Sequence, residues 1–309
     1  MGDARAVVCR PDGTCLAVGG GVVLFNAAGL LGPLKTVPGA GRFTGLACLR
    51  AGNCIAVGES ASGGPVVVEL AADGTPGAVR PVPGAFQLYD LACPSSTTCI
   101  ATGTRRTDIP TYPYSAWTPI YTVITNGQPG PVQRFPRGLS LITGIACPTA
   151  TRCLAVGESG IAVLTRTDGS WTATPASGRT PDGSAGVGWA INCPSPAGCY
   201  AAGWTRANDI AVSAMLAVSP NGVLGAVQPL HDRWGSLYGI SCLADGTCRM
   251  VGGDNATSQG LLVEAKPGSP PVATVWGNSN YFSDVSCLPT IGCGIVGNKP
   301  QQAVFGWKS

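Results

Sequence analysis

The chain has 309 residues, of which 45% are hydrophobic and only 11% are charged, and its formal net charge at pH 7 is +3. The charged residues are spread along the sequence and form no basic patch, which argues against a nucleic-acid partner. No run of about 18 apolar residues occurs, so the sequence predicts no membrane span. We expect a monomer with a large apolar core.

One motif recurs seven times and organises the chain. In its plainest copy, Leu46 to Gly58, an apolar residue lies two positions before the first cysteine, five residues separate the cysteines, and a glycine follows the second cysteine by four. First cysteines recur every 39 to 54 residues, a period typical of repeat folds. We predict one domain over residues 1–309, with units beginning near residues 3, 43, 88, 142, 188, 237 and 282. The cysteine pairs are Cys9/Cys15, Cys48/Cys54, Cys93/Cys99, Cys147/Cys153, Cys193/Cys199, Cys242/Cys248 and Cys287/Cys293.

The paired cysteines, which account for all 14 in the chain, predict disulfides and an oxidising compartment. Zinc is the alternative, but structural zinc sites favour two to four residues between cysteines and often use histidines, and this chain has only His231. We therefore predict seven disulfides between cysteines six positions apart, and no metal or cofactor. We therefore predict a secreted or cell-surface protein, and we expect that its export signal, which is absent from this sequence, has been removed.

Each unit is predicted to contain four short strands. The first ends at the first cysteine (89–93), the second begins at the second cysteine (153–157), the third is rich in β-branched residues (66–70), and the fourth follows a turn (79–82). We predict an all-β, seven-bladed β-propeller of four-stranded antiparallel blades with one disulfide per blade. The last recognisable strand is the third of its unit, so blade 7 is expected to be three-stranded or completed from outside this sequence. Dipeptides that favour tight hairpins precede four of the fourth strands: Asp73-Gly74, Asn126-Gly127, Asp168-Gly169 and Asn221-Gly222.

The innermost strands predict a central site. The residue two before each first cysteine is large and aliphatic, and its neighbours on either side are mostly small, which suits close packing. Asp90 and Asp284 break this rule three positions before a cysteine, where the other units have Gly or Ala. Because their blades lie nearly opposite in the ring, we expect both carboxylates to face a central funnel beside Tyr89 and Ser283. Alternatively, each carboxylate accepts hydrogen bonds from neighbouring loop amides.

The fourth unit resembles a known repeat. Cys153-Leu154-Ala155-Val156-Gly157 is followed by Thr165-Arg166-Thr167-Asp168-Gly169-Ser170-Trp171. This pattern resembles the Asp-box (BNR) and photosystem-II-assembly-type propeller repeats of secreted bacterial proteins, in a cysteine-paired form like that of actinobacterial exported proteins. The resemblance covers the chain as architecture, although no unit has the full Asp-box spacing. It implies a secreted propeller, and its motifs are structural turns that imply no catalysis.

The predicted function is an exported module that binds a cell-surface glycan or protein through its loop-bearing face. Unit 3 carries a long loop over 104–117, and aromatic residues mixed with charged ones suit stacking on sugars or anchoring a protein. Tyr238 and Phe282, which flank innermost strands, are expected instead to cap blade cores. The predicted ligand-binding residues are Asp90, Asp284, Tyr89, Arg105, Arg106, Tyr112, Tyr114, Trp117, Trp204 and Trp234.

Two other functions are open: a carbohydrate-active enzyme, a glycoside hydrolase or lyase with acids in the central pocket, and a structural repeat block of a larger surface protein. An enzyme needs converging acids in a pocket, whereas a binder needs only an exposed aromatic shelf. We assign no catalytic residue, because the arginines match no sialidase spacing and a Ser-His-Asp site would need His231, which reads as a solvated loop residue. Asn255-Ala256-Thr257 matches a glycosylation sequon and is interpreted as a chance match.

Overall fold

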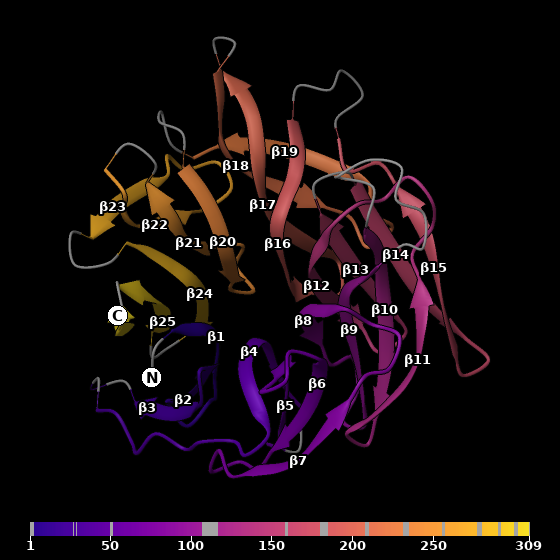
Figure 1. The fold of residues 1–309 in the computed structure, drawn as a ribbon. Coiled ribbons are helices and arrows are strands. Elements are labelled where there is room, and N and C mark those ends of the chain that lie inside the picture. The colour runs from indigo at the N-terminus through magenta and orange to yellow at the C-terminus, as the bar shows by residue number, and fades with distance from the viewer. Residues whose placement is uncertain are drawn as a thin grey trace.

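The computed structural model arranges antiparallel β-sheets around a central axis, with the first strand of each sheet innermost (Figure 1). It describes residues 3–26, 28, 30–49, 52–106, 117–157, 160–179, 185–207, 210–230, 235–254, 257–276, 280–289, 292–299 and 302–308.

The strands are given sheet by sheet, with semicolons between sheets. The first three sheets are β1 (Ala4–Cys9), β2 (Thr14–Gly19) and β3 (Val22–Asn26); β4 (Ala40–Cys48), β5 (Cys54–Ser60), β6 (Pro65–Leu70) and β7 (Pro76–Pro81); β8 (Gln87–Ala92), β9 (Thr98–Arg106), β10 (Trp117–Thr125) and β11 (Gln128–Arg134). The next two are β12 (Ile142–Thr149), β13 (Arg152–Gly157), β14 (Gly160–Thr167) and β15 (Ser170–Ala176); β16 (Ala185–Ser195), β17 (Gly198–Ala207), β18 (Ile210–Val218) and β19 (Leu224–Pro229). The last two are β20 (Gly235–Cys242), β21 (Cys248–Asp254), β22 (Gln259–Ala265) and β23 (Val272–Trp276); β24 (Tyr281–Leu288), β25 (Gly292–Lys299) and β26 (Gln302–Lys308).

The prediction of seven four-stranded blades is wrong. Within the described residues, five sheets have four strands, whereas the sheets β1–β3 and β24–β26 have three. Three strands were expected at the C-terminal end but not at the N-terminal end. Among the described residues after β3, the chain forms no further strand of this sheet and pairs back through isolated bridges from Leu31 to Phe25 and from Lys35 to Val22. Pro33 lies between these bridges and has no N–H to donate, so the segment forms no continuous fourth strand.

The predicted disulfide pairing is confirmed. All seven bridges join cysteines six residues apart, with Cα atoms separated by 3.8 to 4.0 Å. Cys9 pairs directly with Cys15 across β1 and β2, and Cys287 pairs with Cys293 across β24 and β25. Each bridge therefore closes the hairpin between the two innermost strands of its sheet. Seven disulfides are typical of proteins that fold in an oxidising, extracellular environment.

The second cysteine of each pair is buried in the apolar core. Cys99, which is bonded to Cys93, and Cys199, which is bonded to Cys193, are each only 1% exposed. Cys99 packs in one core cluster with residues such as Ile55, and Cys199 packs in another. Neither sulfur is open to a ligand, and no cysteine lines the axial cavity described below. Cys99 and Cys199 are therefore structural residues of the core.

The hairpin dipeptides form two kinds of turn. Asn126-Gly127 and Asp168-Gly169 are two-residue loops in which both residues have positive φ, between 49° and 81°. This is the conformation that matches the twist of the flanking strands. Gly74 and Gly222 have φ of 76° and 77° but lie in five-residue connections between strands. The dipeptides thus mark turns correctly, although two of the turns are longer than predicted.

The apolar core lies between neighbouring sheets. Leu16 of β2 packs in one cluster with Phe43 of β4 and Val68 of β6, and the same pattern repeats from sheet to sheet around the axis. The last sheet packs on the first in a cluster that contains Val23 and Val296. Because each sheet covers the face of the next, no sheet has to be stable alone. Among the described residues, no helix is long and apolar enough to cross a membrane.

Candidate functional site: the axial cavity

A β-bulge interrupts the innermost strand of every sheet at the same place. In β1 the pairing passes from Ala4 to Ala6, in β8 from Leu88 to Asp90, and in β16, where two residues are skipped, from Val187 to Ala190. A bulge adds an unpaired residue and re-aims its side chain. The bulged residue four positions before each first cysteine lines the cavity described below, so each sheet contributes one. These bulged residues are Arg5, Thr44, Tyr89, Thr143, Trp189, Tyr238 and Ser283.

The repeated glycine, four residues after each second cysteine, makes room for the bulge. A Cβ atom on Gly58 would lie 2.1 Å from the carbonyl oxygen of Arg42, and one on Gly19 would lie 1.7 Å from that of Asp3. At all seven glycines, the corresponding carbonyl oxygen lies 1.7 to 2.4 Å from the added Cβ. No side chain fits at such distances, so any other residue at this position would displace the innermost strand.

The innermost strands of all seven sheets enclose a cavity of about 550 Å³, which we call the axial cavity. Its wall combines charged, hydroxyl-bearing and aromatic groups, which differ from sheet to sheet. The predicted residues Asp90, Asp284 and Tyr89 all line it, so the two acids share one cavity as expected. Besides the bulged residues, the lining includes Arg42, Gln87, Asp90, Leu141, Ala190, Ile191, Ile240, Tyr281 and Asp284.

The two aspartates connect neighbouring sheets by accepting hydrogen bonds from backbone amides. The carboxylate of Asp90 accepts one from the amide of Leu91 at 2.8 Å and one from the amide of Ile145, in the next sheet, at 2.9 Å. Asp284 does the same with Val285 and Val7, both at 2.8 Å. The donors belong to the innermost strands and not to the loops, so the predicted alternative was right about backbone amides and wrong about where they lie.

Burial in the axial cavity makes both acids weaker. Desolvation raises the pKa of Asp90 to about 6 and that of Asp284 to about 7, although the accepted amide hydrogen bonds act in the opposite direction. The charge of Asp90 adds to the rise at Asp284. The two carboxyl groups therefore influence each other across the cavity and change charge near neutral pH.

Aromatic rings line much of the remaining wall. Tyr238 and Tyr281 meet edge to face with ring centroids 5.9 Å apart, and Trp189 belongs to the neighbouring sheet. The expectation that Tyr238 caps a blade core is wrong: the bulge directs its ring to the axial cavity, and 42% of the residue is exposed. Phe282, which is not bulged, is fully buried as expected and packs against Trp276.

Two arginines supply positive charge to the axial cavity. Arg5 contacts Asp3 at 2.5 Å, and Arg42 contacts Glu59 at 3.5 Å. Both ion pairs are partly exposed. The cavity thus holds two guanidinium groups and two carboxyl groups. Among the described residues, no group of three or more His, Cys, Asp or Glu side chains could hold a metal ion.

A second aromatic group lies away from the axial cavity. Phe86 and Trp117 have ring centroids 4.5 Å apart, and the guanidinium of Arg106 lies 5.0 Å from the first ring and 5.9 Å from the second. We call Phe86, Arg106 and Trp117 the aromatic cluster. Phe86 and Trp117 are 41% and 39% exposed, so the cluster presents an apolar surface beside the end of β9.

The remaining predicted residues do not join the axial cavity. Trp204 lines a separate pocket of about 80 Å³ and stacks with Arg179, whose guanidinium is 5.7 Å from the ring. Arg105 lies on β9 next to the aromatic cluster. Tyr112, Tyr114 and Trp234 lie outside the described residues, as does His231.

Sequence reasoning missed most of the bulged residues. Only Tyr89 was predicted to bind ligand, and Ser283 was placed beside the funnel. A signal was present, because the position four before each first cysteine changes chemistry from unit to unit, whereas the position two before it is large and aliphatic in every unit. Without the bulge, strand alternation places this position on the same face as the large aliphatic residue two further on, which is buried.

No family model matches the chain, and no curated protein is significantly similar in sequence. Among solved structures, the WD40 domain of Neurospora crassa Pan2 is similar at a TM-score of 0.63, with 12% sequence identity, and the match covers 100% of this chain and 90% of that one. At this identity the similarity concerns the fold alone. The chain is thus similar to this WD40 domain in having a β-propeller fold.

Proposed function

We propose that this protein is an exported binding module that recognises a cell-surface glycan through the axial cavity. A volume of about 550 Å³ is within the usual range for small-molecule sites. Trp189 and Tyr238 offer ring faces on which a sugar can stack, and Thr44, Thr143 and Gln87 offer polar groups for sugar hydroxyls. Export is supported by the seven disulfides, which persist in oxidising compartments.

One observation carries this proposal: the bulge brings one side chain from each sheet to the same cavity. The strands that hold these side chains are fixed by disulfides and by buried neighbours, so the wall is rigid and its chemistry is set by sequence at one position per sheet. A rigid, mixed aromatic and polar cavity suits a small polar ligand that is recognised from several sides.

A glycan array tests the proposal. We expect the wild-type protein to bind a restricted set of glycans, and we expect Trp189→Ala and Tyr238→Ala to lose that binding by at least about tenfold. Trp117→Ala, which removes an aromatic ring of similar exposure outside the axial cavity, serves as the matched control and is expected to bind normally. Retained binding in both cavity variants would contradict the proposal.

Protein recognition by the aromatic cluster is the second candidate function. Exposed aromatic rings stacked with an arginine are the side chains most often found at the energetic centre of protein interfaces. Phe86, Arg106 and Trp117 form such a group, and propellers commonly act as interaction scaffolds. Loss of binding to whole target cells in Trp117→Ala, with normal binding in Trp189→Ala, would favour this function over the first.

Hydrolysis in the axial cavity is the alternative that involves catalysis. A carboxyl group with a pKa of about 6 or 7 can act as a general acid near neutral pH. However, both oxygens of Asp90 and of Asp284 already accept backbone hydrogen bonds, which suits a structural role better. We expect bound glycans to be recovered intact; new reducing ends that vanish in Asp90→Asn would instead indicate a glycosidase.

A further inference from the structure

Each innermost strand has one backbone amide, two residues before its first cysteine, that points away from the second strand of its sheet, and we call these seven groups the axial amides. Each disulfide joins residues that face each other without exchanging backbone hydrogen bonds, because Cα atoms only 3.8 to 4.0 Å apart are typical of such pairs. The residue two before the first cysteine has the same phase, so its N–H also points away from the second strand. The bonds from Val7 and Ile145 to the two aspartates confirm this direction.

The two aspartates use four of these seven amides. Asp284 accepts from its neighbour Val285 and from Val7, and Asp90 accepts from Leu91 and Ile145. Each carboxylate therefore spans a pair of axial amides that belong to adjacent sheets. Within the part of the chain that the structure describes, the axial amides of three other residues show no hydrogen bond to a neighbouring sheet: Leu46, Ile191 and Ile240.

Ile191 and Ile240 form the one adjacent pair among these three, since β16 and β20 are neighbouring innermost strands. They are also the only two of the seven residues at this position that line the axial cavity. The aspartate that would span them by analogy belongs three positions before Cys193, where the chain has Ala190. Both residues of this pair therefore line the cavity with no carboxylate between their amides, whereas an aspartate spans the equivalent pair at two other seams.

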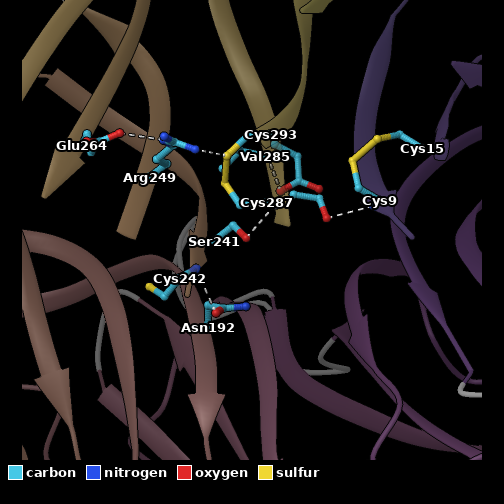
Figure 2. Close-up of a disulfide and its surroundings, with 12 residues drawn as sticks. Cys9, Cys15, Asn192, Ser241, Cys242, Arg249, Glu264, Val285, Cys287 and Cys293 are labelled. Atoms are coloured by element: carbon cyan, nitrogen blue, oxygen red, sulfur yellow. Dashed lines mark hydrogen bonds and ion pairs between the residues drawn. A yellow bond between two sulfur atoms is a disulfide. The ribbon is translucent and has the colours of Figure 1, made fainter. Parts of the chain in front are cut away.

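The next hydrogen bond along this seam shows that β16 and β20 have the required spacing. Asn192 accepts from the amide of Cys242 at 3.1 Å, as Figure 2 shows. At the seam between β24 and β1, the equivalent bond from Cys9 to Ser286, at 2.9 Å, lies beside the bond to Asp284. The two seams therefore match at Asn192 and Ser286. They differ two residues earlier in the strand, where one has Ala190 and the other has the carboxylate of Asp284.

We propose that the amides of Ile191 and Ile240 bind the carboxylate of an acidic sugar, which takes the place that Asp90 and Asp284 occupy at the other seams. This inference rests on the proposed glycan function and narrows it to sugars with a carboxylate. Backbone N–H groups that converge on an anion form short, charge-assisted hydrogen bonds. The protein itself displays this recognition twice, with donor–acceptor distances of 2.8 to 2.9 Å.

The flanking side chains favour a sugar over a peptide as the bearer of the carboxylate. Trp189 and Tyr238 are the bulged residues of the same two strands, so each ring lies two positions before one of the paired amides, and both line the axial cavity. Two aromatic faces beside a carboxylate site suit a pyranose ring that carries its acid group at one end. The guanidinium groups of Arg5 and Arg42 also line the cavity, where each is paired with an acid, Asp3 or Glu59.

Glucuronic acid and glucose make a matched pair of probes, because they share a ring and differ in a carboxylate against a hydroxymethyl group. We expect calorimetry to show glucuronic acid binding at least about tenfold more tightly than glucose. In ¹⁵N-labelled protein, titration with glucuronic acid should shift the amide resonances of Ile191 and Ile240 and leave that of Leu46 in place. This readout needs no variant and therefore cannot be confused with misfolding.

Ala190→Asp supplies the missing carboxylate from the protein and should abolish glucuronic acid binding. Ala6→Asp is the matched control: it adds the same charge at the same register of β1, where the axial amide of Val7 already has a partner. We expect the control to lose binding by less than about fivefold, as a purely electrostatic effect in solvent would give. A melting temperature near wild type confirms that each variant folds.

The outcomes separate this inference from the proposed function. Equal binding of glucose and glucuronic acid in the axial cavity, with no shift at Ile191 and Ile240, would overturn the carboxylate site but keep the glycan function. Absence of any sugar binding would overturn both. Shifts at both amides with a short peptide bearing a free C-terminal carboxylate, and none with glucuronic acid, would overturn the assignment to sugars.

Discussion

The carboxyl groups of Asp90 and Asp284 hold the propeller together at two seams and make its stability depend on pH. Each pKa is raised above the ordinary value of 3.8, to about 6 and about 7. Between pH 4 and pH 7 the folded state therefore keeps protons that the unfolded state has released. The contribution of these groups is largest at low pH and falls as pH rises through this window.

Asp90→Asn and Asp284→Asn should flatten this dependence. In the wild type we expect the melting temperature to fall as pH rises from 4.5 to 7.5, and in the double variant we expect a smaller fall. At pH 4.5 the double variant should be less stable, by about 1–3 kcal/mol per site, since an asparagine amide cannot accept from both backbone donors. Parallel curves for the two proteins in a pH series of thermal melts would refute this account.

Arg249 should make the Cys287–Cys293 disulfide easier to reduce than the Cys147–Cys153 disulfide. Its guanidinium lies 2.9 Å from the sulfur of Cys293 and is held by Glu264 at 2.7 Å (Figure 2). When dithiothreitol thiolate attacks Cys287, the electron pair of the broken S–S bond goes to Cys293, where the cation stabilises the thiolate. We expect Arg249→Gln to slow this reduction severalfold, measured by alkylation and peptide mapping, with Cys147–Cys153 as the internal reference. An unchanged ratio of rates would contradict the effect.

At the scale of the strand, the repeated glycine and the bulge depend on each other. Gly58 lies beneath the carbonyl of Arg42, and an added Cβ would come within 2.1 Å of its oxygen. We expect Gly58→Ala to lower the free energy of unfolding by at least about 2 kcal/mol, because the strand must shift. Gly64→Ala is the control: its nearest neighbour would be the Ser60 hydroxyl at 3.7 Å, so urea unfolding should show little change. Equal effects of the two substitutions would exclude this role for the glycine.

The disulfide hairpins contribute to every sheet. Each bridge closes a short loop, worth about 2 kcal/mol on the chain-entropy account. We expect full reduction to lower the melting temperature sharply. When the unreduced protein is denatured and alkylated without reductant, we expect no cysteine to be labelled. The first result would show how far the sheets depend on the bridges, and detection of free thiols in the native protein would contradict the pairing.

At the scale of the molecule, the first and last sheets meet without a covalent connection. Val7 and Cys9 of β1 donate to Asp284 and Ser286 of β24, and Figure 1 shows these strands side by side. Every other seam is crossed by the chain itself. We expect Asp284→Ala combined with Ser286→Ala to open this seam first, which would raise amide hydrogen exchange in β1 and β24.

Asp90→Ala provides the comparison, because it removes the equivalent bond at the seam between β8 and β12, which the chain also bridges through β11. Exchange in β1 and β24 should stay at the wild-type level in this variant. Faster exchange at the β8–β12 seam than at the β1–β24 seam, when the two variants are compared, would show that closure does not depend on these two side chains.

The sequence by itself determined the disulfide pairing, the order of strands and the shared cavity of Asp90 and Asp284. These features follow from local spacing: cysteines six apart fit one hairpin, and a fixed register brings equivalent positions to the same place in every sheet. The three-stranded C-terminal sheet was also predicted, because the last strand in the sequence is the third of its unit.

Only the tertiary structure decided the composition of the site. Whether Tyr238 is buried or lines the axial cavity depends on a bulge, which exists because the strand beside it carries a glycine under the opposing carbonyl. The described residues after β3 form no continuous fourth strand because Pro33, which cannot donate a backbone hydrogen bond, falls between the two bridges to β3. The amides of Ile191 and Ile240 are recognised as a candidate carboxylate site only by comparison with the aspartates of other sheets. Hydrogen bonds between sheets are set by three-dimensional packing and not by spacing along one strand.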